Sequence, residues 1–402
     1  MPENASGGSS SSSSLLIRSK NPRRCQAENP LKLLSEFAGP ALSASISYGL
    51  LRRRAGTQQA IPPEKSFFAR SIVALSFWFL GTQGASAHVK WFCAYDAAGQ
   101  PRCLENVLCQ DFELLLALAL LWFFSGCMVE RTSLAELAAR SLNRFTDGLR
   151  LHTEEIIRAV CGFFFISLWA VGGILLTPEL KTTSSMVGPL QLAIAAGLLS
   201  RRTMPFSAAG IVVLFGLAVR DYGTFHLADY PIFLGLAAYL ALAGLQKDLF
   251  GVPPLDVVRY ATAVTLMWAS VEKWAYPEWS FPLLIEHPGM TLGFDSEFYM
   301  RAAGMIEFTL AFALAWTPLV RRVAAAILLG MFISACFEFG KLDVIGHSAI
   351  IVVLVAILSD NQPREADYRA PWLAPAGLCA ALTVTLFAYY VGHAAIFNTS
   401  IL

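Results

Sequence analysis

The sequence predicts an all-α fold, a polytopic transmembrane helical bundle, from three observations. Hydrophobic residues make up 55% of the 402 residues and charged residues only 15%, whereas a soluble domain has about 25% charged residues. Largely uncharged runs of roughly 17 to 25 residues recur along the chain, and each is long enough to cross a bilayer as a helix. The runs are continuously apolar, which excludes the alternating pattern of a membrane β-barrel.

Residues 1–65 differ in composition from everything that follows. They contain a Gly-Ser run from Gly7 to Ser14 and many arginines, which predicts a disordered basic segment. Residues 66–87 resemble an export signal, with an apolar core that ends at Ala85-Ser86-Ala87. They are either a cleaved signal peptide or an uncleaved first transmembrane helix. Because a signal normally lies within about the first 15–30 residues, cleavage would imply a misassigned start codon.

After an exported loop at 88–109, further apolar runs predict helices. They cover 110–129, 156–177, 186–200, 204–220, 228–246, 257–274, 300–319, 322–339, 344–359 and 372–395. Arginine is concentrated in alternate loops, as in the loop that contains Arg131, Arg140, Arg144 and Arg150. By the positive-inside rule, these loops and the basic N-terminal segment lie in the cytoplasm of a bacterial cell. The C-terminus is then periplasmic, and the chain spans the inner membrane.

A weak internal repeat divides most of the chain into two units. Residues 110–246 contain the helices of a first four-helix unit, and residues 257–360 form a second, followed by a last helix at 372–395. Each unit has a helix that ends near Pro-Glu, a double arginine between later helices, and a helix that ends on an aromatic residue and Gly. Four spans return the chain to the same side, so the two units would be parallel.

The second unit contains several short motifs at helix ends. They are Glu272-Lys273, Gly304, Glu307, Arg321-Arg322 and Gly346-His347. In these residues the unit resembles the DoxX-like membrane proteins, over about a quarter of the chain and about half if the first unit is a duplicate. The resemblance implies a four-helix fold and, in some members, a quinone-linked or redox-associated subunit. We also expect a similarity to proteins of plant-associated bacteria, which no residue of the sequence demonstrates.

Histidines and carboxylates lie near the predicted outer ends of the helices. Ionisable groups in a span are costly and usually face the bundle interior. The candidates for an outward-facing polar pocket are Asp229, Glu272, Glu307 and His347. Asp343 and His347 are four residues apart and should share a helix face. Three interpretations stay open: contacts of helix ends with headgroups and basic side chains, a metal site, or translocation of a proton or solute.

The metal interpretation depends on histidine. The candidate ligands are His88, His226, His287 and His347, because imidazole with carboxylate suits zinc, copper or iron. Cleavage after Ala87 would make His88 the amino terminus, and its amine and imidazole together favour copper. Cys93 and Cys103 lie in the same exported loop, where oxidising conditions favour a disulfide between them.

Partners and activity are less well defined by the sequence. A net charge of +1 gives no indication of a nucleic-acid surface, so the lipid bilayer is the one expected partner. The sequence has no P-loop, GxGxxG, HExxH or GxSxG motif. We therefore expect a non-enzymatic membrane component, for small-solute or proton transport or for support of a redox or assembly process. The alternative is a membrane-bound metal- or quinone-linked oxidoreductase with an outward-facing histidine and carboxylate site.

Overall fold

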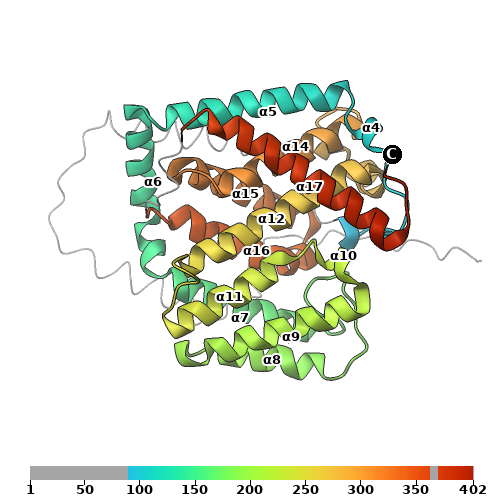
Figure 1. Ribbon diagram of the computed structural model, residues 1–402. Helices are drawn as coiled ribbons and strands as arrows, with labels where there is room; N and C mark the ends of the chain where they lie inside the picture. The colour runs from blue at the N-terminus through green and yellow to red at the C-terminus, as the bar shows by residue number, and fades with distance from the viewer. Residues whose placement is uncertain (1–88, 363–369, 402) are drawn as a thin grey trace, which may run out of the picture. The chain divides into compact units, whose positions relative to one another are not determined.

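The computed structural model describes residues 89–362 and 370–401 (Figure 1). Within these ranges every regular element is a helix, which confirms the all-α bundle. The predictions for residues 1–65 and 66–87, and for His88, lie outside the described residues.

Each predicted run contains a helix, although α7 ends at Val171 rather than at residue 177 and α14 ends at Leu314 rather than at residue 319. The first helices are α4 (Leu104–Val107), α5 (Gln110–Val129), α6 (Ser133–Leu151), α7 (Thr153–Val171), α8 (Val187–Gly197), α9 (Met204–Tyr222), α10 (Thr224–Leu227) and α11 (Pro231–Leu245). The later helices are α12 (Pro254–Ala275), α13 (Phe281–Glu286), α14 (Ser296–Leu314), α15 (Pro318–Phe339), α16 (Lys341–Ser359) and α17 (Leu373–Phe397). Four short 3-10 turns are η1 (Val89–Trp91), η2 (Arg201–Thr203), η3 (Pro277–Trp279) and η4 (Pro288–Thr291).

Among the residues that the structure describes, five helical segments are long and apolar enough to cross a membrane. They are α5, η2 with α9, α15, α16 and α17. Helices α8 and α11 are also apolar but have only 11 and 15 residues, fewer than the roughly 20 that span a bilayer. Helices α7, α12 and α14 have 19, 22 and 19 residues and contain three, four and three charged residues. The chain is therefore a multi-pass membrane protein in contact with lipid.

Two sets of four helices pack through corresponding contacts. In the first set α7 packs on α8, α8 on α9, and α9 on α11; in the second, α12 packs on α14, α14 on α15, and α15 on α16. The sets meet twice, where α11 packs on α12 and where α16 packs on α7. The last helix of each set thus contacts the first helix of the other. A parallel repeat has this pattern, and the duplication itself stays a prediction.

Arginines connect equivalent helix ends in both sets. Their guanidinium groups donate to carbonyl oxygens at the C-terminal ends of neighbouring helices. The bonds join Arg158 to Leu198 (2.8 Å), Arg259 to Leu314 (2.9 Å), Arg201 to Ala243 (3.3 Å) and Arg322 to Leu358 (2.8 Å). The last carbonyls of a helix have no intrahelical donor. A cation at this end is also stabilised by the negative end of the helix dipole. Both double-arginine turns therefore supply a guanidinium that caps a neighbouring helix.

Helix α6 corrects the prediction of a cytoplasmic loop between the spans 110–129 and 156–177. It is amphipathic, with recurring arginines and with exposed apolar side chains such as Leu134 and Phe145. The transmembrane spans are predicted from long uncharged runs. The charged residues of α6 recur along its whole length, so it contains no such run. Figure 1 shows α6 running across the direction of α5, an orientation suited to a helix that lies along the membrane surface.

Arg322 attaches α6 to the bundle. Its guanidinium donates to Asn143 Oδ1 at 2.7 Å and to Thr146 Oγ1 at 3.1 Å. We expect Arg322→Met to speed backbone hydrogen exchange in α6, because the loss of these bonds costs about 1–3 kcal/mol. Hydrogen-exchange mass spectrometry of residues 133–151 measures this. Arg202→Met, at an exposed arginine, is the control, and an equal acceleration in both variants would contradict the assignment.

Candidate functional site

The predicted exported loop contains, near its start, a lysine whose side chain is buried in the bundle. Lys90 lies in η1, and its side chain is only 3% exposed. Its Nζ atom lies 3.1 Å from Asp229 Oδ2 and 2.7 Å from Glu272 Oε1. Asp229 precedes α11 and Glu272 lies in the last turn of α12, so the lysine bridges the place where the two helix sets meet.

A third carboxyl group, that of Glu179, lies close enough to act on Lys90 electrostatically. We call Lys90, Glu179, Asp229 and Glu272 the charge cluster. Glu179 lies between α7 and α8, and its Oε1 accepts hydrogen bonds from Thr177 Oγ1 at 2.8 Å and from the Tyr230 hydroxyl. Its Oε2 is buried and has no hydrogen-bond partner among the described residues. Burial raises the pKa of Glu179 despite these hydrogen bonds, which favours the protonated form.

Lys90, by contrast, keeps its proton. Burial alone would lower the pKa of Lys90, but the carboxylates of Asp229 and Glu272 outweigh that effect and raise it. The ammonium also lies 5.8 Å from the ring centroid of Tyr95 and 5.9 Å from that of Trp279, where the ring faces add a further attraction. A permanently charged lysine is thus enclosed at this end of the bundle.

His226, in α10, lies beside the cluster. Its ring is nearly parallel to those of Tyr95 and Tyr222, with centroids 5.6 Å and 5.7 Å away. Burial, together with the charge of Lys90, lowers the pKa of His226 to about 4. The imidazole is therefore neutral at physiological pH and packs as an aromatic ring.

This neutral histidine predicts a pH effect on stability. An unfolded histidine has a pKa of about 6.5, above the folded value of about 4 for His226. Its contribution to stability is therefore complete above about pH 6.5 and decreases as the pH falls toward about 4. Over that interval we expect the wild type to lose about 1–3 kcal/mol more unfolding free energy than His226→Gln. Thermal unfolding in detergent across this pH range measures the difference, and parallel curves would refute it.

The motif residues of α12 and α14 form one packed contact. Lys273 Nζ lies 2.9 Å from Glu307 Oε2, so the residue after Glu272 makes an ion pair of its own. One turn before Glu307, the indole of Trp274 covers Gly304 so closely that a Cβ atom there would clash with it. The glycine and the glutamate at these positions thus allow α12 and α14 to pack closely.

The residue after Lys90 covers the start of α16. The ring centroid of Trp91 lies 4.6 Å from that of His347. Gly346 leaves the space for this contact, because a Cβ atom at that position would clash with the Trp91 ring. Lys90 and Trp91 together thus connect the charge cluster to the Gly346-His347 motif.

Gly346→Ala should displace Trp91. We expect a loss of about 1–3 kcal/mol in unfolding free energy, the usual result of overpacking a filled contact. Thermal unfolding in detergent measures it. Gly126→Ala in α5 is the matched control, because nothing lies within 4 Å of a Cβ atom there and alanine favours helix by about 0.5–1 kcal/mol. If Gly346→Ala is as stable as that control, Trp91 does not occupy this position.

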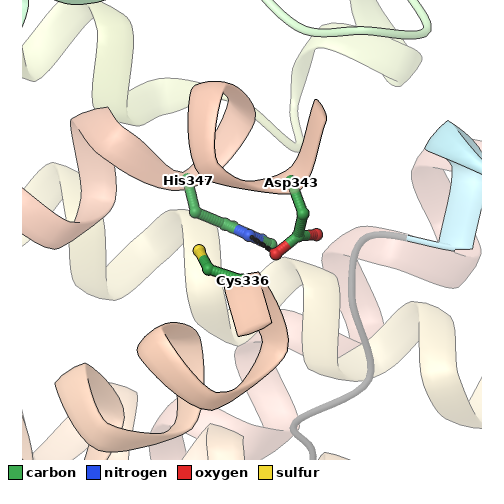
Figure 2. Close-up of side chains that lie close together, drawn as sticks. All are labelled: Cys336, Asp343 and His347. Carbon is green, nitrogen blue, oxygen red and sulfur yellow. Dashed lines mark hydrogen bonds and ion pairs between the residues drawn. The ribbon is translucent and has the colours of Figure 1, made fainter. Parts of the chain in front are cut away.

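His347 also belongs to a second cluster, which Figure 2 shows. Its Nδ1 lies 2.9 Å from Asp343 Oδ2, which confirms that the two residues share a helix face. Cys336 of α15 approaches both, and the ligand atoms of the three residues all lie within 4.8 Å of one another. We call Cys336, Asp343 and His347 the Cys-Asp-His group.

The four predicted pocket residues have different partners. Asp229 and Glu272 share Lys90, whereas Glu307 pairs with Lys273 and His347 pairs with Asp343. The prediction therefore combined two ion-pair sites and a third cluster into one pocket. The three sites are neighbours along the chain. Lys90 and Trp91 are adjacent residues that contact two of them, and Glu272 and Lys273 are adjacent residues of the two ion-pair sites.

The predicted histidine ligands are also separate. His226 packs between tyrosines, and His287 Nδ1 lies 2.6 Å from Glu338 Oε1. Within the described residues, the grouped metal ligands include His347 but neither His226 nor His287. The neighbours of His347 in the structure are the thiol of Cys336 and the carboxylate of Asp343, rather than His226 and His287.

The predicted disulfide is not present in the structure. Cys93 and Cys103 are both free cysteines. Cys103 is exposed at the N-cap position of α4, whereas the Cys93 thiol interacts with the backbone of Leu283 in α13. The two thiols therefore have different surroundings despite their short separation in sequence.

Comparisons of the chain with protein-family models, curated proteins and solved structures give no match. The DoxX-like resemblance therefore rests on the motif residues alone. Three site residues, Lys90, Glu179 and Cys336, were missed by the sequence analysis. Lys90 and Glu179 lie in loops without periodicity, and Cys336 is indistinguishable from other cysteines in apolar runs. Of these three residues, only Glu179 belongs to a sequence motif, the Pro178-Glu179 pair that follows a predicted helix.

Proposed function

We propose that this chain is a non-enzymatic component of a bacterial inner membrane that takes up and releases protons at the charge cluster. The observation that carries the proposal is Glu179, a buried carboxyl group beside the ion pairs of Lys90. Among the described residues no cation forms an ion pair with Glu179 within 4.0 Å. A buried carboxylate without a direct ion-pair partner is costly, which favours the protonated form of Glu179.

Protonation of Glu179 is coupled to the position of Lys90. When Glu179 loses its proton, its carboxylate attracts Lys90 in competition with Asp229 and Glu272. When it regains the proton, Lys90 is held by those two carboxylates alone, as in the structure. The Tyr230 hydroxyl, which donates a hydrogen bond to Glu179, stabilises the carboxylate while the proton is absent. Proton exchange is thus linked to the loop segment that contains Lys90.

The arrangement favours a proton over a larger solute. The side chains of Lys90 and Asp229 are 3% and 0% exposed and are in direct contact. A proton moves along such contacts without an open path, whereas a solute would have to separate the ion pairs. By the positive-inside rule the cluster faces the periplasm, so it would form the periplasmic end of the proposed proton path across the membrane.

Proton flux into proteoliposomes tests the proposal. Vesicles with an internal pH dye receive a potassium diffusion potential, and we expect acidification above that of protein-free vesicles. Glu179→Gln should slow it by about a hundredfold, the lower end of what a positioned proton-transfer group contributes. Glu297→Gln is the control, because this glutamate pairs with Arg102 at the surface. Absent flux in the wild type, or full flux in Glu179→Gln, would refute the function.

The alternative, a metal- or quinone-linked oxidoreductase, has one specific observation in its favour. The Cys-Asp-His group offers a thiol, a carboxylate and an imidazole, a ligand set suited to zinc, iron or copper. Quinone as a cofactor depends on the DoxX-like resemblance alone. Reduction of a quinone analogue by an added electron donor, catalysed by the purified protein and abolished in His347→Gln, would support this alternative over proton exchange.

A further inference from the structure

The turn between α15 and α16 brings three metal-ligand side chains together. Gly340 separates the two helices and has a positive φ of 76°, a conformation that favours glycine. Cys336 lies one turn before this glycine, and Asp343 lies three residues after it. The short connection makes α15 and α16 pack side by side, so the thiol faces the Asp343 and His347 side chains (Figure 2).

We propose that Cys336, Asp343 and His347 bind a divalent transition-metal ion of the zinc class. The ligand atoms lie within 4.8 Å of one another. Tetrahedral zinc, with bonds of about 2.0–2.3 Å, needs ligand separations of about 3.3–3.7 Å. Side-chain movements of about an ångström therefore close the site around an ion, and three protein ligands leave the fourth position for water or another ligand.

Charge balance supports an ion at this position. Asp343 is fully buried, and its Oδ1 has no hydrogen-bond partner among the described residues. The Cys336 sulfur lies within 4.8 Å of the ligand oxygen of the same carboxyl group. A divalent ion that displaces the thiol proton would be neutralised by one thiolate and one carboxylate, with a neutral imidazole as the third ligand. A neutral complex is the least costly state for a site buried between helices.

Aromatic rings enclose the site. The centroids of Trp91 and Phe332 lie 4.6 Å and 4.8 Å from that of the His347 ring, which is 1% exposed. An apolar enclosure excludes water and strengthens the ion's interaction with its charged ligands. Because Trp91 follows Lys90, metal binding would also be sensitive to the position of the exported loop.

A second histidine–carboxylate pair at the same end of the bundle provides the comparison. His287 Nδ1 lies 2.6 Å from Glu338 Oε1, but the pair is partly exposed, with His287 30% and Glu338 46% accessible. It lacks a thiol, and the described residues add no further ligand to it. A hydrogen bond explains that pair fully, whereas the Cys-Asp-His group has one more ligand and an unsatisfied buried oxygen.

Cobalt substitution of the full-length protein in detergent tests the site. We expect the wild type to bind one Co²⁺ ion tightly, with a thiolate-to-cobalt charge-transfer band in the near ultraviolet. The band should disappear in Cys336→Ser and in His347→Gln, and should stay unchanged in His287→Gln and Cys161→Ser. A wild type without the band, or a band that Cys336→Ser retains, would overturn the proposal.

A second measurement needs no variant, so misfolding cannot confuse it. Alkylation of individual cysteines is followed by mass spectrometry with and without Zn²⁺. At a zinc concentration of about 100 times the Kd, we expect alkylation of Cys336 to slow about a hundredfold while that of Cys103 and Cys109 is unchanged. Equal rates with and without zinc would refute the site. Because neither result involves Glu179, the metal site and the proton function can fail independently.

Discussion

Replacing Lys90 by methionine should lower the free energy of unfolding by about 3–5 kcal/mol, the range found when one partner of a buried ion pair is removed. Methionine keeps an unbranched apolar stem up to the Cε position but removes Nζ, and with it the attraction to the rings of Tyr95 and Trp279. Asp229 and Glu272 lose the cation that they share and stay largely buried, with side chains 0% and 12% exposed. The dominant effect is therefore the cost of uncompensated negative charge.

Thermal and denaturant unfolding in detergent measure this loss. The loss of stability should be smaller at acid pH, where protons neutralise the carboxylates that pair with Lys90 in the wild type. The double variant Lys90→Met/Glu272→Gln should recover part of the stability, because it removes one of those charges. Lys181→Met, at an exposed lysine, is the control. A Lys90→Met protein as stable as this control would show that Lys90 is not in the cluster.

Arg259→Met should cause a loss of similar size, again about 3–5 kcal/mol. Arg259 and Asp256 are 3% and 5% exposed and lie 2.9 Å apart, and the arginine also caps α14 at Leu314. Its counterpart in the first helix set, Arg158, is 18% exposed and lies 3.8 Å from Glu154. Because solvent screens the second pair, Arg158→Met should cost only about 1–2 kcal/mol, mainly through its lost hydrogen bonds.

The two arginine variants form a matched pair for unfolding experiments. Their positions in the two helix sets are equivalent, so their difference reports burial rather than local chemistry. Arg259→Met combined with Asp256→Asn should recover stability, because it removes the carboxylate that the arginine balances. Equal losses in the two single variants would contradict the assigned burial of the Arg259 site.

The predicted helices agree with the structure where apolar runs are long. The run 110–129 is α5 with the same limits, because continuous hydrophobicity leaves a chain in lipid no alternative to helix. Helix α6 was not predicted, because its apolar and charged residues are interspersed with the period of an α-helix. A search for uncharged runs does not detect such a helix, although a search for amphipathic periodicity would.

The candidate site was less predictable than the fold. Asp343 and His347 could be paired from their spacing, because four residues form about one helical turn. Lys90 bonds to residues 139 and 182 positions away in sequence, and no local pattern records such contacts. Cys336 likewise meets His347 only because α15 and α16 pack together. Long-range packing, rather than residue type, therefore selects which of the many polar groups form clusters.

A measurement of the protonation state of Glu179 tests most directly the proposal that the charge cluster holds a proton. Infrared spectroscopy of the purified protein detects the carbonyl stretch of a protonated carboxyl group, which a carboxylate lacks. At neutral pH we predict such a band in the wild type, with its loss in Glu179→Gln and its persistence in Glu297→Gln. A wild-type spectrum without the band, or a band unchanged in Glu179→Gln, would contradict a proton held at this site.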